Sequence, residues 1–136
     1  MTSNSHFSTE LGGEPTAPGR FVTVNEISPV EFVEGLEFRP VLGERTMANF
    51  VHFDPHTEAP THVHEEEQIV IMLEGELEFD IDGETRLLTP GDVAVVPPWV
   101  SHGARTREVP CLEVDVFNPP RKTLLDHAAA QIVNPN

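Results

Sequence analysis

Short stretches of alternating or continuous apolar residues run through most of the chain, and glycine and proline separate them. Alternation over a few residues predicts half-buried strands, and the turn residues predict the connections between strands. Many short strands at near-even spacing are typical of an all-β sandwich or barrel. Clear alternation or β-branched composition predicts strands at the following segments: 20–24, 47–53, 76–81, 84–88 and 111–117.

The turns between these strands are also visible in the sequence. Asp82-Gly83 separates 76–81 from 84–88, and this dipeptide favours the tight turn of a β-hairpin. The segment 89–102 opens with a Pro-Gly turn and continues as an apolar strand that stops at Pro97 and Pro98. On 111–117, alternation puts Cys111, Glu113, Asp115 and Phe117 on one face of the strand.

The two ends of the chain differ from the middle. Residues 1–19 are rich in Ser, Thr, Gly and Pro without periodicity, which predicts a mobile tail. Residues 121–133 have the only clearly helical composition and predict a short terminal helix. A chain of 136 residues is the size of one domain, which we place at 20–136.

The stretch 60–75 carries the candidate chemistry. His62 and His64 stand two residues apart, so on an extended strand both imidazoles leave the same face and form a chelating pair for a metal ion. The following residues, 68–75, are apolar at successive positions, which predicts a strand buried on both faces. The sequence therefore predicts a buried metal site.

Two motifs in order resemble the cupin family. The first is HVHEEEQIVIMLEG at 62–75, and the second is GDVAVVPPWVSH at 91–102. The resemblance covers roughly residues 45–120 and implies a double-stranded β-helix, the cupin jelly-roll barrel. It also implies a metal held by His62, His64 and His102.

The chain departs from the cupin pattern at three positions. Gln68 stands where the family usually has a glutamate ligand, and His56 and Trp99 stand where it has glycine. On a continuous strand Gln68 shares the face of His62 and His64, whereas Glu67 points the other way. A turn before Gln68 would remove that argument, so Glu67 stays as the alternative fourth ligand.

One branch of the family, the uronate-linearising enzymes of the KdgF type, resembles this chain further. That branch also uses glutamine at the fourth ligand position, and its D-x-F-x-x-x-R signature is matched here by Asp115, Phe117 and Arg121. The resemblance implies that Asp115 is an acid/base residue and that Arg121 binds a substrate carboxylate. Trp99 and Phe117 are candidates for the substrate pocket. Asp115 and Arg121 could instead form a structural ion pair.

Three neutral imidazoles and one amide oxygen would leave a divalent ion with its full charge, which favours anionic substrates and stabilises an enolate or oxyanion. These ligands do not select among Zn, Ni, Mn and Fe. The function expected is that of an isomerase or lyase acting on a small carboxylated carbonyl compound, such as ring opening of an unsaturated uronate. The alternatives are an Fe(II)-dependent dioxygenase, a polyketide-type cyclase or tailoring enzyme, and a non-catalytic metal- or ligand-binding cupin.

The composition of the chain limits its expected binding partners and location. A formal charge of -15 argues against nucleic acid and anionic membranes as partners. No segment resembles a signal peptide or a membrane span, so a cytoplasmic location is expected. The single cysteine, Cys111, excludes an intrachain disulfide and is expected in the core. The resemblance further implies a homodimer paired through the strands of residues 20–50.

Overall fold

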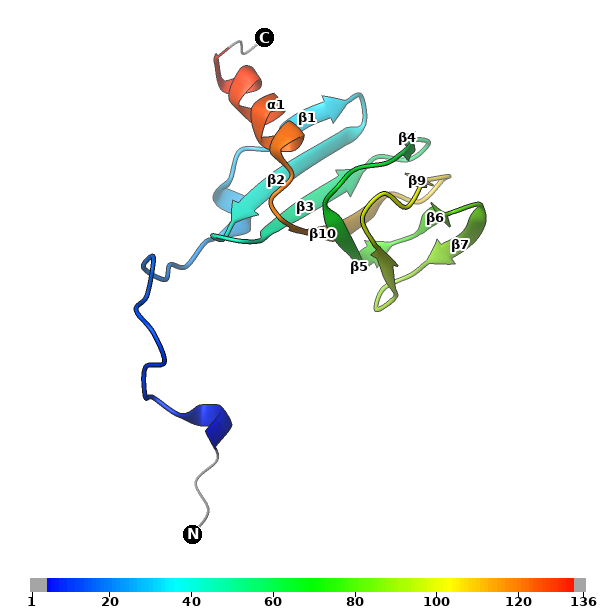
Figure 1. Ribbon diagram of the computed structural model, residues 1–136. Coiled ribbons are helices and arrows are strands. Elements are labelled where there is room, and N and C mark those ends of the chain that lie inside the picture. Colours follow the sequence, from blue (N-terminus) through cyan, green and yellow to red (C-terminus); the bar gives the residue numbers. More distant parts are fainter. Residues whose placement is uncertain (1–4, 134–136) are drawn as a thin grey trace.

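The computed structural model describes residues 5–133, and its strands form two antiparallel sheets of six and four strands (Figure 1). The order in the large sheet is β1-β2-β3-β10-β5-β8, and in the small sheet β4-β9-β6-β7. The strands of the large sheet are β1 (Val30–Val33), β2 (Leu36–Leu42), β3 (Met47–Phe53), β10 (Cys111–Asn118), β5 (Glu67–Gly75) and β8 (Val93–Val96). Those of the small sheet are β4 (Glu58–His62), β9 (His102–Arg105), β6 (Leu77–Ile81) and β7 (Glu84–Leu88).

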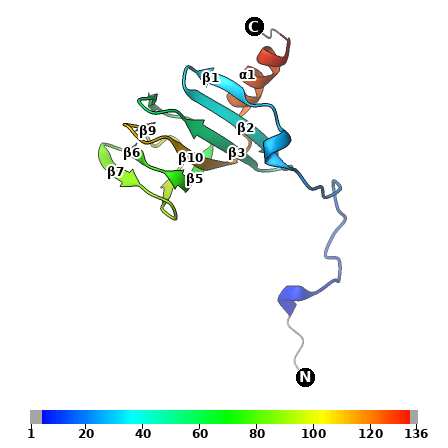
Figure 2. The same cartoon turned by 180° about the vertical axis from the view of Figure 1, so that it is seen from behind.

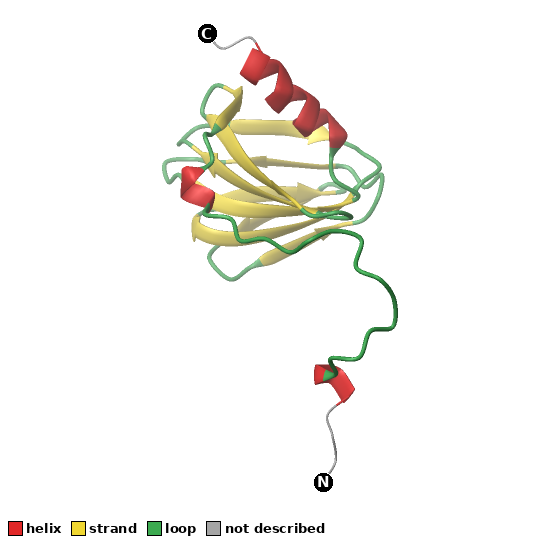
Figure 3. Ribbon diagram, turned by 90° about the vertical axis from the view of Figure 1, so that its left-hand side faces the viewer, coloured by secondary structure: helices red, strands yellow, loops and turns green. Residues whose placement is uncertain are grey.

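This arrangement confirms the predicted all-β jelly-roll class. The strands expected at 47–53 and 111–117 are β3 and β10, and the expected hairpin is β6 and β7. Asp82 and Gly83 both have positive φ, 48° and 88°, as the tight hairpin turn requires. The predicted helix is α1 (Lys122–Val133), which lies next to β1 at one end of the barrel (Figures 1 and 3).

The prediction of a strand at 20–24 is wrong. Described residues before β1 hold only two 3-10 turns, η1 (Ser5–Phe7) and η2 (Val24–Glu26), and the first of them lies far from the sheets (Figures 1 and 2). Apolar alternation stabilises a strand only where another strand accepts its hydrogen bonds and a core covers one face. Phe21 meets neither condition, because its side chain is fully exposed.

The expectation that 68–75 is buried on both faces is also wrong. Side chains on β5 alternate, with Gln68, Val70 and Met72 buried and Ile69 and Ile71 only partly buried. The inner side chains face the small sheet, whereas no layer of the described chain covers the outer face. A continuous apolar run therefore did not distinguish a strand with one covered face from a strand with two.

Apolar side chains fill the space between the sheets. The largest fully buried ones include Phe38, Met47, Met72 and Leu77. Cys111 joins this core as predicted, and burial raises the pKa of its thiol to about 12. Neither the 3-10 turns nor α1, within residues 5–133, has the length and apolar content needed to cross a membrane.

Candidate metal centre and substrate cavity

The three predicted histidines converge between the two sheets. His62 ends β4 and His102 begins β9, and the two residues are paired across these strands. His64 lies in the following loop, with its ring centroid 4.7 Å from that of His102. One ring nitrogen from each histidine lies within 4.8 Å of the nitrogens of the other two. This spacing is close enough for the three nitrogens to bind one metal ion.

Each imidazole is oriented by a backbone carbonyl. The Nδ1 atoms of His62, His64 and His102 lie 2.7, 3.0 and 2.9 Å from carbonyl oxygens two residues away. A carbonyl oxygen only accepts, so each Nδ1 carries the proton and donates. Each Nε2 then presents its lone pair, the form of imidazole that binds metals.

Gln68 supplies a fourth donor atom to this cluster. Its Oε1 lies 3.0 Å from Nε2 of both His64 and His102. Burial lowers the pKa of both imidazoles, that of His102 to about 4, so neither ring carries a second proton at neutral pH. The lone pairs of His64 Nε2, His102 Nε2 and Gln68 Oε1 thus face one another, and none of these atoms carries a proton. Neighbouring ligands at right angles around an ion with bonds of about 2.1 Å are separated by about 3.0 Å, so these atoms fit a divalent cation.

Glu67 does not point into this cluster. The strand-parity argument for preferring Gln68 was wrong, because β4 ends at His62 and β5 begins only at Glu67. Gln68 nevertheless lies on the inner face of β5, whereas Glu67 is exposed. The half-buried carboxylate of this loop, Glu66, lies 3.6 Å from Nδ1 of His64, on the side of the ring opposite the lone pair.

Two residues in unusual backbone conformations shape the surrounding loops. Trp99 and His56, which replace family glycines, have positive φ of 66° and 56°. These positions therefore keep the conformation that glycine adopts most readily. The Trp99 backbone N–H donates to the His64 carbonyl at 2.9 Å and so holds the two motif loops together.

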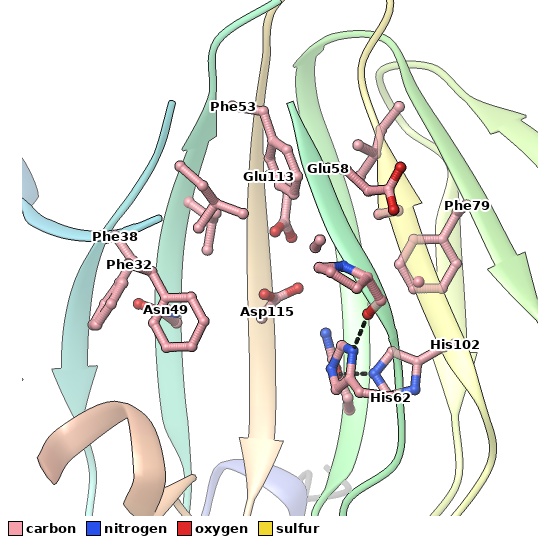
Figure 4. Close-up of a pocket in the computed structure, with 18 of the residues that line it drawn as sticks. Phe32, Phe38, Asn49, Phe53, Glu58, His62, Phe79, His102, Glu113 and Asp115 are labelled. Atoms are coloured by element: carbon pink, nitrogen blue, oxygen red, sulfur yellow. Dashed lines mark hydrogen bonds between the residues drawn. The ribbon is translucent and has the colours of Figure 1, made fainter. Parts of the chain in front are cut away.

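A cavity of about 360 Å³ opens beside the histidines and extends between the sheets (Figure 4). Asp115, Phe117 and Arg121 line it, together with His62, Gln68 and His102. Trp99 does not line it, contrary to expectation, because its side chain points outward and is 64% exposed. The remaining wall is mainly aromatic and aliphatic, with Phe38, Phe53, Leu77 and Phe79 among its members.

Asp115 lies on the inner face of β10, between the histidines and Glu113 (Figure 4). Burial raises the pKa of Asp115, and interactions with Glu113, the Gln68 side chain and the Arg121 charge oppose that rise. The pKa of Glu113 is raised well above its ordinary value by burial and by the neighbouring Asp115 charge. Burial therefore disfavours ionisation of both carboxyl groups, and Gln68 and Arg121 favour the charged form of Asp115.

Arg121 immediately precedes α1 and is separated from β10 only by Pro119 and Pro120, so both elements restrain its backbone. Burial lowers the pKa of its guanidinium, and the charges of Glu66 and Asp115 oppose this. Its buried Nε has no hydrogen-bond partner in the described chain. An unpaired buried polar group costs about 1–3 kcal/mol, so this donor is available to a ligand bound in the cavity.

Sequence reasoning missed two residues of this cavity, Asn49 and Glu113. Alternation placed Glu113 on the face of Asp115 but gave it no role. Asn49 interrupts the apolar inner face of β3, where Met47, Val51 and Phe53 are its neighbours. A polar residue at an inward position of an apolar strand was the available signal for both.

Several known proteins are similar to this chain. KdgF from Halomonas sp. is 32% identical over 79% of this chain and 99% of its own structure, with a TM-score of 0.75. An RmlC-like cupin from Shewanella frigidimarina is 29% identical over 79% of this chain and 96% of its own structure, with a TM-score of 0.73. H2HPP isomerase from Bacillus subtilis is 42% identical over 52 residues, which are 38% of this chain and 22% of that protein.

The cupin domain itself matches residues 49–117, which run from β3 to β10 and include all three histidines and Gln68. This match covers half of the chain, and the fold and the histidine cluster agree with it. The chain belongs to the cupin family.

Proposed function

We propose that this cupin is a metal-dependent isomerase or lyase acting on a small carboxylated carbonyl compound, and that it opens the ring of an unsaturated uronate. The observation that carries the proposal is that one cavity is shared by a histidine cluster able to hold a metal ion, a carboxyl pair and a half-buried arginine. The similarity to KdgF over nearly the whole of that protein supports it.

His62, His64, His102 and Gln68 would hold the divalent ion. When bound, the ion supplies a Lewis acid that stabilises negative charge on a substrate oxygen. Its four ligands are neutral, so none of its charge is cancelled by the protein. This donor set suits substrates that develop an enolate or oxyanion.

Arg121 binds the substrate carboxylate in this proposal. A guanidinium recognises a carboxylate through parallel N–H donors, and the unpartnered buried Nε is one such donor. The same contact places the ring between Arg121 and the histidines. The aromatic wall excludes water from the bound ring, which strengthens these polar contacts.

Asp115 moves the proton. In the ring-opening reaction the anomeric hydroxyl loses a proton, the bond between carbon 1 and the ring oxygen breaks, and carbon 4 of the former double bond gains a proton. The product is an isomer of the substrate, so no redox partner is needed. Asp115 is suited to this transfer because burial raises its proton affinity, while Glu113, Gln68 and Arg121 beside it favour its ionised form.

Two measurements test the proposal. The first is the metal content of protein purified without added metal, where we expect close to one divalent ion per chain. The second is the loss of the conjugated double bond of unsaturated galacturonate, followed by ultraviolet absorbance in air and under anaerobic conditions. Equal rates in both support the isomerase. Stoichiometric oxygen consumption would favour the dioxygenase, and absence of turnover by metal-loaded protein would contradict the proposal.

The non-catalytic alternative predicts that Asp115 and Arg121 point away from the histidines. Both side chains instead line the cavity that His62 and His102 also line. This placement favours an enzyme over a ligand sensor.

A further inference from the structure

Three buried side-chain atoms of the described chain have no hydrogen-bond partner, and all three belong to residues that line the same cavity. They are Oδ1 of Asn49, Oε2 of Glu113 and Nε of Arg121. Asn49 and Glu113 are only 2% and 3% exposed, so water does not reach these oxygens freely. Buried polar groups are normally paired, so atoms gathered in one cavity without partners point to a ligand.

Asn49 and Glu113 lie together on the inner face of the large sheet. Asn49 on β3 is directly opposite Asp115 on β10, and Glu113 is opposite the next inward residue of β3, Val51. Glu113 lies on the side of Asp115 away from the histidines (Figure 4). The two residues therefore form a polar region beyond the proposed proton-transfer group and away from the metal cluster.

The unpaired atoms define the chemistry of the ligand. Oδ1 of Asn49 is an acceptor. Oε2 of Glu113 is a carboxyl oxygen without a partner and offers a second acceptor. The Arg121 Nε is a donor. A complementary molecule offers two donors and one acceptor, and hydroxyl groups together with a carboxylate provide this set.

We propose that Asn49 and Glu113 form a second polar subsite that accepts hydrogen bonds from substrate hydroxyl groups, so that the cavity selects hydroxylated carboxylates. This inference rests on the proposed function for the placement of the carboxylate. The walls near the subsite are apolar, with Phe38, Val51 and Phe53 among them, and cannot replace a missing hydroxyl. A ligand without hydroxyls leaves both acceptors buried and unpaired, which disfavours its binding.

The test compares two carboxylates that share one ring. D-galacturonate carries ring hydroxyls, and tetrahydropyran-2-carboxylate has the same ring and carboxylate without them. Binding of each to the metal-loaded protein is measured by isothermal titration calorimetry. The wild-type protein is expected to bind galacturonate at least about 10-fold more tightly, since each hydrogen bond contributes about 3- to 10-fold.

Substitutions at Asn49 and Glu113 test whether these residues cause the preference for galacturonate. Asn49→Leu and Glu113→Leu keep side-chain volume but remove the acceptors, and each is expected to reduce the preference about 5-fold without weakening tetrahydropyran-2-carboxylate. Glu113→Gln keeps an acceptor oxygen and is expected to retain the preference. Asn25→Leu, at an exposed position in η2, is the matched control and should leave it unchanged. If Glu113→Leu does not fold, Asn49→Leu decides the outcome.

A wild-type protein that binds both compounds equally, or that does not bind galacturonate, would overturn the inference. So would an unchanged preference in Asn49→Leu. These outcomes are separate from the fate of the proposed function. If the protein opens the ring but shows no preference for galacturonate, only the proposed subsite is contradicted. If the protein shows a preference that depends on Asn49 but does not open the ring, only the proposed reaction is contradicted.

Discussion

Two clusters of charged side chains in this barrel differ in whether their polar atoms find partners. On the small sheet, Arg105 pairs with both Glu78 and Asp80, and Arg107 pairs with Glu78. Hydrogen bonds from these arginines lower the pKa of both carboxyl groups. Each charge in this outer cluster is balanced by a neighbour, so the cluster is complete without a ligand.

The inner cluster of Glu113, Asp115 and Arg121 is buried and incomplete. Two carboxyl groups share one strand face with a single arginine nearby, and burial raises the pKa of both acids. Unpartnered atoms remain on Glu113 and Arg121. Paired charges near the surface add stability, whereas buried charges left partly unpaired are costly to the fold and are typical of ligand-binding sites.

The largest expected effect comes from the inner cluster. Asp115→Asn removes the group that moves the proton, and we expect the rate of ring opening to fall about 100- to 10,000-fold. The melting temperature should stay the same or rise, because the amide removes a carboxylate charge whose burial is unfavourable. Turnover by ultraviolet absorbance and thermal unfolding by circular dichroism check both parts.

Asp126→Asn is the matched control for this variant. Asp126 is exposed on α1, and its replacement should leave both measurements unchanged. A destabilised Asp115→Asn protein that retains its activity would show that Asp115 forms a structural ion pair with Arg121, and would remove the contrast between the clusters.

The next effect concerns the metal cluster. Gln68→Ala removes one of four converging donor atoms and is expected to weaken metal binding about 10- to 100-fold. Glu67→Ala changes the adjacent, exposed residue and should leave affinity unchanged. Competition with a chromophoric chelator measures both. A larger loss in Glu67→Ala than in Gln68→Ala would assign the fourth ligand to the carboxylate.

Sequence pattern predicted the parts of this protein that depend on local rules. The sequence of β10 alternates strictly, so alternation predicted that Asp115 and Phe117 share one face, although it did not show that this face is the inner one. The hairpin followed from Asp82-Gly83, and the pairing of His62 with His64 followed from their spacing. These features depend on period and turn chemistry, which neighbouring residues determine. The third histidine, His102, was implied by the resemblance to the cupin motifs.

Features that depend on tertiary contacts could not be predicted. The break between β4 and β5 places His64 in a loop, although the sequence there reads as a continuous strand. Trp99 was expected in the pocket, but its backbone, not its side chain, contributes to the site. The joint placement of Asn49 and Glu113 in one cavity depends on the pairing of β3 with β10. The two residues are more than sixty positions apart in the sequence, so local patterns could not predict it.

The smallest expected effect comes from the outer cluster. Arg105→Met removes the central cation, and we expect the free energy of unfolding at neutral pH to fall by about 1 kcal/mol, with catalytic activity unchanged. Arg86→Met is the matched control, because the exposed Arg86 pairs with exposed Glu84 alone among residues 5–133 and should contribute almost nothing. Urea denaturation of both variants measures the difference.

The pH dependence of this effect has a definite sign. The folded state lowers the pKa of Asp80 and Glu78 from ordinary values of 3.8 and 4.5. Their ionised forms therefore stabilise the fold fully above about pH 5, and this stability is lost as the pH falls through the lower folded values. The difference in the free energy of unfolding between the wild-type protein and Arg105→Met should disappear in that acidic range. A gap that persists when the carboxyl groups are protonated would mean that Arg105 acts through the packing of its aliphatic part, and the outer cluster would then owe its stability to contact and not to charge.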